Sequence, residues 1–269
     1  MAKKYLVVNA DDFGLCPSTN YASFLALAKG CVTSLSIMAP APYFKQAVSI
    51  LHKHNMRHVG VHLTLTSEFS KLRYGPISFL KEVPSLIDNK GYFPKTIYYL
   101  SKHARQEEVK IELENQIKKV IKHNLIPTHL DCHMFALHYK VLKRTDFLPV
   151  ILYLCRKFNL PFRSPFLKEK NFLKKNNIKV LYRSFKGSYD IPARKKKIGY
   201  DNWLKRLPCS VSELILHCGY DNPSLRTITK RSLRRQADYD YAVSKSTLSL
   251  LKKEKIKLLP WEKVPSYLK

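Results

Sequence analysis

The stretch Tyr5-Leu6-Val7-Val8-Asn9-Ala10-Asp11-Asp12 is an apolar run that ends abruptly in two carboxylates. A short apolar run of this kind, bounded by polar residues, is typical of a buried strand, here Tyr5–Ala10. Runs of the same character recur along the chain, and segments with helical periodicity lie between them. The further runs are Val32–Met38, His58–Thr66, Thr128–His133, Pro161–Ser164, Lys179–Phe185, Glu213–Tyr220 and Lys255–Leu259.

Apolar residues at helical spacing mark the segments between these runs. One stripe begins at Tyr21 and Phe24, and Gly30 closes it as a C-terminal stop. Other helices are expected over Tyr43–His54, around Leu113–Ile121, and over Leu142–Phe158 and Leu233–Lys253. Strands that alternate with helices predict the α/β class with parallel strands. We predict a single-domain, TIM-like (β/α) barrel over residues 1–269. An open doubly wound sheet is the alternative, which the absence of a glycine-rich dinucleotide turn and of a phosphate loop disfavours.

Composition narrows the class of protein. A chain of 269 residues that is 45% hydrophobic and 25% charged is globular rather than disordered. Its apolar runs are all shorter than the roughly 18 to 20 residues of a membrane-spanning helix. The first run stops at an acidic pair, so it is not the core of a secretion signal, and a cytoplasmic protein is expected. The six cysteines include no CxxC pair and are expected to be reduced, mostly structural thiols.

The net charge of +28 has two interpretations. It could attract nucleic acid, anionic lipid or an acidic glycan, or it could be a lysine-rich, solvated surface. The basic clusters Arg194 to Lys197, Lys230 to Arg235 and Lys252 to Lys257 are dispersed and fall on predicted helices or loops, away from the polar strand ends. No RNA-binding aromatic motif or helix-turn-helix spacing accompanies them. We therefore expect surface solvation and no nucleic-acid partner.

Polar residues follow several of the predicted strands, which in a barrel places them at the active-site end. Asp11 and Asp12 follow the first run and could hold a metal and act as a base, or could form a cap or Asx-turn before the next helix. His62 shares one face of its strand with Thr64 and Thr66, as a hydrogen-bonded residue or as a ligand. His217 ends another run, where it could donate a proton to a leaving group.

The segment Thr128-His129-Leu130-Asp131-Cys132-His133 carries the strongest signal. Strand alternation places His129, Asp131 and His133 on one face. Three titratable groups on one face are costly to bury unless they pair with one another or bind a cation. Imidazole and carboxylate are ligands of divalent metals, so we favour metal binding over a purely polar network. The spacing alone does not choose between His129 and His133.

These blocks resemble the YdjC-like carbohydrate deacetylases, which include chitooligosaccharide deacetylases and hopanoid-associated relatives. The resemblance is carried, in family order across nearly the whole chain, by residues 8–15 (VNADDFGL), 32–34 (VTS), 60–66 (GVHLTLT), 127–133 (PTHLDCH), 213–220 (ELILHCGY) and 256–261.

The resemblance implies a barrel of the glycoside hydrolase/deacetylase type that removes N-acetyl groups from amino sugars. It implies one divalent ion, magnesium in the family with zinc as the alternative, held by Asp12, His62 and His133. It also implies Asp11 as the general base, His217 as a candidate acid, and Arg163 as the arginine that follows the metal strand. We expect His129 and Asp131 to support the ligands or the substrate.

Two departures from the family pattern concern the same blocks. Met134-Phe135-Ala136 stand where the family usually carries further histidines, and Cys218 replaces a proline after His217. Both leave the implied metal set intact.

Segments 67–99 and 187–202 are expected to be long loops over the active-site face. Tyr92, Phe93, Tyr98 and Tyr99 could stack on sugar rings or pack within the first loop.

Three other functions remain as alternatives: a glycoside hydrolase on the same barrel, a thiol hydrolase using Cys132 or Cys218, and a nucleic-acid-binding protein. A glycoside hydrolase needs two carboxylates about 5 to 9.5 Å apart, which adjacent Asp11 and Asp12 cannot both supply. A homodimer is one possible assembly.

Overall fold

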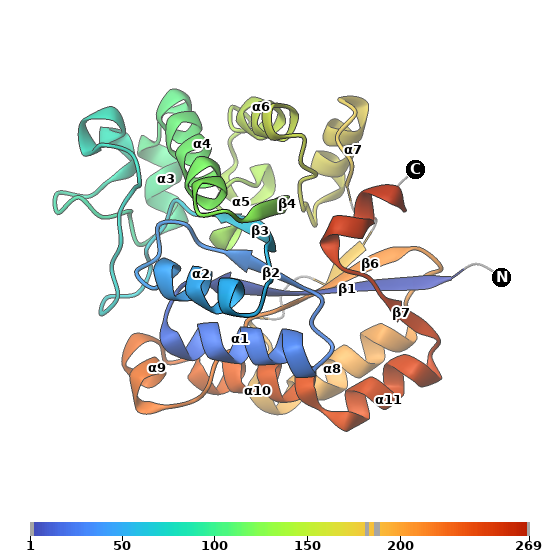
Figure 1. The fold of residues 1–269 in the computed structure, drawn as a ribbon. Coiled ribbons are helices and arrows are strands. Elements are labelled where there is room, and N and C mark those ends of the chain that lie inside the picture. The colour runs from blue at the N-terminus through green and yellow to red at the C-terminus, as the bar shows by residue number, and fades with distance from the viewer. Residues whose placement is uncertain (1–2, 181–182, 186–188, 268–269) are drawn as a thin grey trace. The chain divides into compact units, whose positions relative to one another are not determined.

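The computed structural model describes residues 3–180, 183–185 and 189–267. The chain divides into two compact units: residues 1–36 and 181–269 form the first, and residues 37–180 form the second. In Figure 1 the first unit runs in blue at the start of the chain and in orange to red at its end. The second unit, residues 37–180, runs between them from a lighter blue through cyan and green to yellow.

The strands lie close to the predicted runs, whereas the predicted helices Leu142–Phe158 and Leu233–Lys253 are each divided in two and several further helices were not predicted. The strands are β1 (Lys4–Phe13), β2 (Ser34–Ile37), β3 (His58–Leu63), β4 (Ile126–Cys132), β5 (Arg183–Phe185), β6 (Val211–Leu216) and β7 (Ile256–Leu258). The α-helices are α1 (Pro17–Lys29), α2 (Phe44–Lys53), α3 (Ile97–His103), α4 (Gln106–Lys122), α5 (Tyr139–Leu142), α6 (Leu148–Phe158), α7 (Leu167–Lys175), α8 (Ala193–Lys205), α9 (Pro223–Ile228), α10 (Ser232–Val243) and α11 (Lys245–Lys253). Short 3-10 helices are η1 (Leu80–Glu82), η2 (Pro84–Leu86), η3 (His133–Phe135) and η4 (Trp261–Ser266). Each of these strands overlaps a predicted run, while the run Pro161–Ser164 forms a single bridge from Phe162 to Leu130.

In the first unit the strands lie in the order β2-β1-β6-β5, with β7 also beside β1. The pairings of β1 with β6 and β7, and of β5 with β6, are parallel. Helices α1, α8, α10 and α11 gather on one side of β1 (Figure 1). Ala10 of β1 pairs with Leu216 of β6. Because the strands are parallel, the residues that follow these two, Asp11 and His217, leave the sheet side by side.

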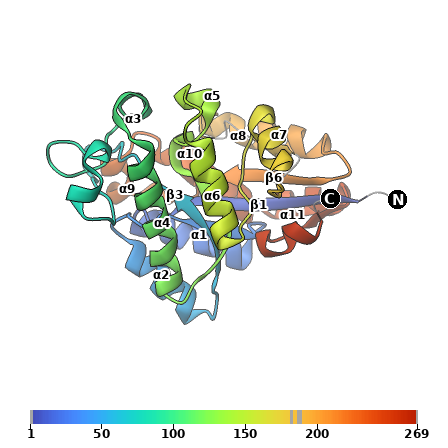
Figure 2. The same ribbon diagram turned by 90° about the horizontal axis from the view of Figure 1, so that it is seen from above.

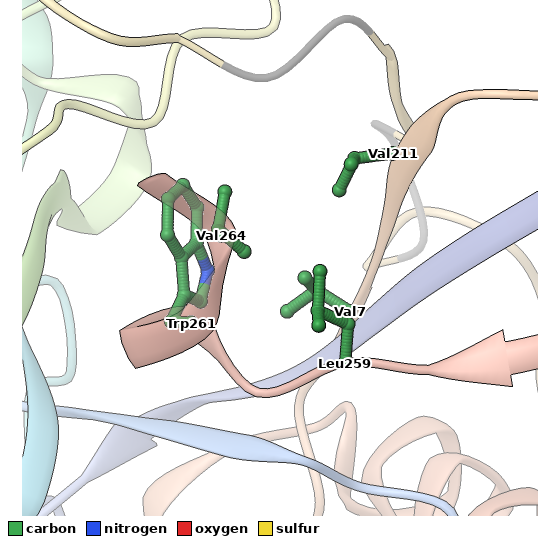
Figure 3. Packing of buried hydrophobic residues seen from close by; sticks show 5 residues of the cluster. All are labelled: Val7, Val211, Leu259, Trp261 and Val264. Carbon is green, nitrogen blue, oxygen red and sulfur yellow. The ribbon is translucent and has the colours of Figure 1, made fainter. Parts of the chain in front are cut away.

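The core of the first unit includes a cluster that closes over β1. Figure 3 shows Val7 and Leu259 beside Trp261, with Val211 and Val264 completing the cluster. The Trp261 side chain is fully buried, and its indole Nε1 donates a hydrogen bond of 2.9 Å to Glu213. The segment 256–261, one of the blocks that carry the family resemblance, therefore belongs to the hydrophobic core and packs against β1.

In the second unit β3 and β4 pair in parallel, and His62 lies opposite Asp131 in the register. The apolar stripe expected on α4 is buried at Leu113 and Ile117. Helix α4 lies beside α6 (Figures 1 and 2), where Tyr153 donates a hydrogen bond of 2.9 Å to Glu114. Parallel strands flanked by helices confirm the expected α/β class. Closure of the strands into a ring stays a prediction.

One of the two expected loops is wrong over most of its length, and the other contains short helical turns. The segment 187–202 is helical from Ala193 onward, because Tyr200 and Trp203 give it a buried face that a lysine-rich composition concealed. Its residues 187–188 lie outside the described part of the chain. The segment 67–99 is largely irregular but contains η1 and η2 and the start of α3.

Among the described residues, no helix combines the length and the apolar character needed to cross a membrane. All six cysteines are unpaired, as expected, and only Cys209 is exposed.

Candidate active site

The carboxylates Asp11 and Asp12 lie at the end of β1, and both are almost fully buried. Asp12 has a φ of 63°, and Gly14 follows at 104°, so the chain turns sharply there in the left-handed region. The N-cap of α1 is Cys16, so neither aspartate caps that helix. The alternative interpretation of the pair as a helix cap is therefore wrong.

Each aspartate has a buried partner from its own unit. The Asn9 side chain donates a hydrogen bond of 2.7 Å to Asp11. The Arg235 guanidinium donates one of 2.6 Å to Asp12, and both side chains are about 1% exposed. Removing one member of a buried ion pair costs about 3–5 kcal/mol because the other charge stays uncompensated. Arg235 therefore gives the buried Asp12 carboxylate a charged partner and fixes its orientation.

His217 follows β6, and its environment keeps the ring neutral. Burial lowers the pKa of His217 to about 4, and the carboxylates of Asp12 and Asp11 only partly oppose this effect. The ring packs against Tyr189 with centroids 5.0 Å apart. At neutral pH the resting histidine is a proton acceptor, so it must gain a proton before it can act as an acid.

The backbone of His217 is held by a buried carboxylate. Asp238 accepts a hydrogen bond of 2.9 Å from the His217 amide. The same carboxylate accepts bonds from Lys196 at 2.7 Å and from Tyr200 at 2.6 Å. Burial lowers the pKa of Lys196, while the charge of Asp238 opposes that effect. A network from α8 and α10 therefore fixes the end of β6.

These contacts correct the interpretation of the basic clusters. Lys196 and Arg235 are about 1% exposed, although each belongs to a run that was expected to be solvated surface. Lys196 contacts Asp238, which binds the end of β6, and Arg235 contacts Asp12 at the end of β1. The sequence predicts instead that the basic clusters lie away from these strand ends. The sequence gives one signal for them: on α10, Arg235 and Asp238 are three positions apart and so share a helix face.

In the second unit, Asp131 is the centre of a buried polar cluster. Its carboxylate contacts His62 Nδ1 at 2.6 Å, His129 Nε2 at 3.3 Å and Arg163 at 3.0 Å. Burial alone would raise the pKa of Asp131, but Arg163 and His62, with the hydrogen bond to His129, hold it well below its usual range. The strand face predicted for His129 and Asp131 is confirmed as a paired cluster, and Arg163 joins it.

His133 lies just beyond β4. Its Nε2 contacts Glu68 at 3.0 Å, and its ring lies 5.4 Å from that of His62, edge to face. The next two residues, Met134 and Phe135, have φ values of 52° and 57°. A left-handed conformation costs a residue with a Cβ atom roughly 1–2 kcal/mol, so the surroundings must hold this turn. The departure from the family pattern therefore falls on a strained segment.

The long segment after β3 is tied to α4 by buried polar side chains. Gln116 binds the backbone of Thr64 at both its amide (2.9 Å) and its carbonyl (2.7 Å). Glu112 accepts hydrogen bonds from the amides of Ile77 and Ser78 and from the Ser78 hydroxyl. Phe93 is fully buried and so packs inside the protein. Helix α4 therefore fixes the chain just before the segment 67–99, at Thr64, and again within it, at Ile77 and Ser78.

Besides His62 and Asp131, a second buried histidine–carboxylate pair lies at the C-terminal end of the turn after β4. His138 Nδ1 contacts Glu169 at 2.5 Å, and both residues are buried. Burial alone would lower the pKa of His138, but the neighbouring Cys132 and the hydrogen-bonded Glu169 raise it to about 9. This pair gave no signal in the sequence, because its members are 31 positions apart.

The His138–Glu169 pair predicts a pH-dependent stability. Because the folded pKa of His138 lies above its ordinary value of about 6.5, its contribution is present below pH 6.5 and is lost as pH rises to about 9. We expect the free energy of unfolding to fall more in the wild type than in Glu169→Gln over this range, by only a part of the roughly 3 kcal/mol that the whole shift represents, because Cys132 also raises this pKa. Urea unfolding of both proteins at several pH values measures the difference. Parallel pH profiles would contradict the assignment.

The sequence-predicted residues thus fall into two groups, one in each unit. The structure brings Asp11, Asp12 and His217 together in the first unit. It brings His62, His129, Asp131, His133 and Arg163 together in the second. Sequence analysis missed Arg235, Asp238 and Lys196 in the first group and Glu68 in the second.

The family model described as YdjC-like protein matches residues 5–253. The chain belongs to the YdjC-like family. A relative from Thermoanaerobacter pseudethanolicus named carbohydrate deacetylase is 29% identical over 257 residues, which is 95% of this chain and 97% of the relative. A carbohydrate deacetylase of Thermus thermophilus is 30% identical over 255 residues, covering 88% of this chain and 85% of that protein.

A solved YdjC-like structure has the same fold. The protein of Enterococcus faecalis described as a cellobiose-phosphate cleavage protein superposes with a TM-score of 0.84 at 27% sequence identity. The match covers 97% of this chain and 99% of that protein. The expected family and α/β fold are therefore confirmed.

Proposed function

We propose that this YdjC-like chain is a carbohydrate deacetylase that hydrolyses the N-acetyl group of an acetylated amino sugar with the help of one divalent metal ion. The near full-length relatives named carbohydrate deacetylase support the reaction class. The observation that carries the proposal is the buried contact of 2.6 Å between Asp131 and His62 Nδ1. A histidine held in this way by a carboxylate presents its other nitrogen to a metal ion.

The donor chemistry of the second unit fits a metal. Buried histidines and carboxylates of the ligand type lie at the ends of its strands. In the proposal, Asp12, His62 and His133 hold the ion. Three protein ligands leave positions open for water and substrate, as a catalytic site requires. Two imidazoles and one carboxylate suit zinc or another first-row ion, whereas the family resemblance implies magnesium, which prefers oxygen ligands.

The residues of the chain would divide the chemistry among them. When bound, the ion polarises the acetyl carbonyl and lowers the pKa of a water molecule. Asp11, held by Asn9, takes the proton of the attacking water. His217 is neutral at rest, so it receives the proton that Asp11 has taken from water and gives it to the departing sugar amine.

Two arginines have supporting roles in the proposed reaction. Arg235 holds the Asp12 carboxylate in one orientation. Arg163 neutralises Asp131, which in turn orients His62. Neither arginine needs to touch the sugar for the reaction to depend on it.

Product analysis tests the proposal. With di-N-acetylchitobiose as the substrate, we expect stoichiometric release of acetate and no new reducing ends. A chelator should abolish turnover, and added zinc or magnesium should restore it; the ion that restores it identifies the metal. New reducing ends would instead indicate a glycoside hydrolase. Loss of activity on thiol alkylation, with indifference to the chelator, would indicate a thiol hydrolase.

A further inference from the structure

The turn that follows β4 begins at the proposed ligand His133, and its backbone conformation depends on contacts from outside the turn. Met134 and Phe135 both adopt left-handed backbone conformations although neither is glycine. Residues with a Cβ atom persist in this region only when surrounding contacts hold them there. Because the position of His133 depends on this turn, whatever holds the turn also positions His133.

The far end of the turn is anchored by a buried pair. His138 contacts Glu169 of α7 at 2.5 Å, and the amide of His138 donates to the carbonyl of Phe135 at 3.0 Å. Cys132, the residue just before His133, is close enough to the imidazole to raise its pKa. The backbone of His138 therefore closes the strained turn, and its side chain ties the turn to a separate helix.

The same carboxylate oxygen reaches a second part of the unit. Ser164 donates a hydrogen bond of 2.7 Å to Glu169 Oε2, the oxygen that contacts His138. Ser164 follows Arg163, and Arg163 pairs with the Asp131 carboxylate that contacts His62. Glu169 is thus connected to the surroundings of both histidines proposed as ligands in this unit.

Aromatic rings enclose the pair. The rings of Phe166, Phe135 and Phe162 lie 5.1 to 5.6 Å from that of His138. Such an environment disfavours a polar pair unless its hydrogen bonds are satisfied. Apolar side chains of similar volume would stabilise this part of the core at least as well as a buried ion pair does. The pair is therefore expected to have a role other than filling the core.

We propose that Glu169 and His138 are positioning residues that lock the turn after β4 and thereby fix His133 for metal binding. This inference rests on the proposed function, because it treats His133 as a ligand. Neither residue touches the metal or the sugar. Their effect is transmitted through the turn on one side and through Ser164 and Arg163 on the other.

The test compares zinc affinity of metal-free proteins. We expect Glu169→Ala to raise the dissociation constant for zinc about 10- to 100-fold. Glu169→Gln keeps an oxygen that can accept from Ser164 and should restore much of the affinity. The matched control is Leu154→Ala, which removes a buried side chain of α6 and lowers stability while both members of the pair are kept. All titrations are made well below each protein's melting temperature.

A second measurement does not depend on metal. Hydrogen exchange of the metal-free protein should quicken over residues 133–138 in Glu169→Ala, and in His138→Asn if the first variant fails to fold. It should not quicken there in Leu154→Ala. Unchanged zinc affinity and unchanged exchange of the turn would overturn the inference. A wild-type chain that binds no zinc or magnesium would overturn the proposed function, and the exchange of the turn would then decide the structural role of Glu169.

Discussion

Replacing Asp11 by asparagine is expected to lower kcat by about 10²- to 10⁴-fold, the usual contribution of a general base, while metal content stays unchanged. Asparagine has nearly the same size and can still accept the hydrogen bond that Asn9 donates at 2.7 Å. It cannot take a proton from water. The loss should therefore appear in kcat rather than in the fold.

The measurement is acetate release by the purified variant, together with its metal content and melting temperature. Asp240→Asn is a suitable control, because it removes the same charge from an exposed position on α10. A variant at position 11 that retains near wild-type turnover would return Asp11 to a structural role. A variant that loses its metal would make Asp11 a ligand instead of a base.

The second large effect separates the two histidines that the sequence left as alternatives. We expect His133→Ala to lose the metal and at least about 10²-fold in activity, since a missing ligand opens the proposed site. His129→Ala should retain metal, because His129 contacts Asp131 and Thr128 within the strand. It should instead lower the free energy of unfolding by about 1–3 kcal/mol, the cost of leaving a buried partner unsatisfied.

Elemental analysis and denaturant unfolding of both variants distinguish these outcomes. Full occupancy in His133→Ala with loss in His129→Ala would transfer the ligand role to His129. Full occupancy in Asp12→Ala, His62→Ala and His133→Ala would end the proposed ligand set. Asp12→Ala also leaves the buried Arg235 charge without its partner, so the stability of this variant must be measured separately.

Local pattern was sufficient to predict the strands and the polar residues at their ends. Strand alternation predicted that His129 and Asp131 share a face, and the 2.6 Å contact across β3 and β4 follows from a register that places His62 opposite Asp131. The same reasoning predicted α1 and its stop at Gly30. These features depend on residues close in sequence or on neighbouring strands, which periodicity reports directly.

What the sequence concealed are partners far apart in the chain. Arg235 reaches Asp12 across 223 positions, and in the sequence it looks like any other residue of a basic run. The sequence places Lys196 in an expected loop, although it lies on a helix and is buried against Asp238. Composition records how many charges a segment carries but not which of them faces inward.

The division of the chain into units has a consequence for how the protein is made. The second unit is one continuous segment, residues 37–180, so it can form while the remainder is still being synthesised. The first unit joins residues 1–36 to residues 181–269, and β1 pairs there with β6 and β7. Until those late strands have been made, β1 can pair only with β2, and its other edge stays open to association with other chains. The acidic pair at the end of β1 thus reaches its native surroundings only after the segment that carries Arg235 has been made.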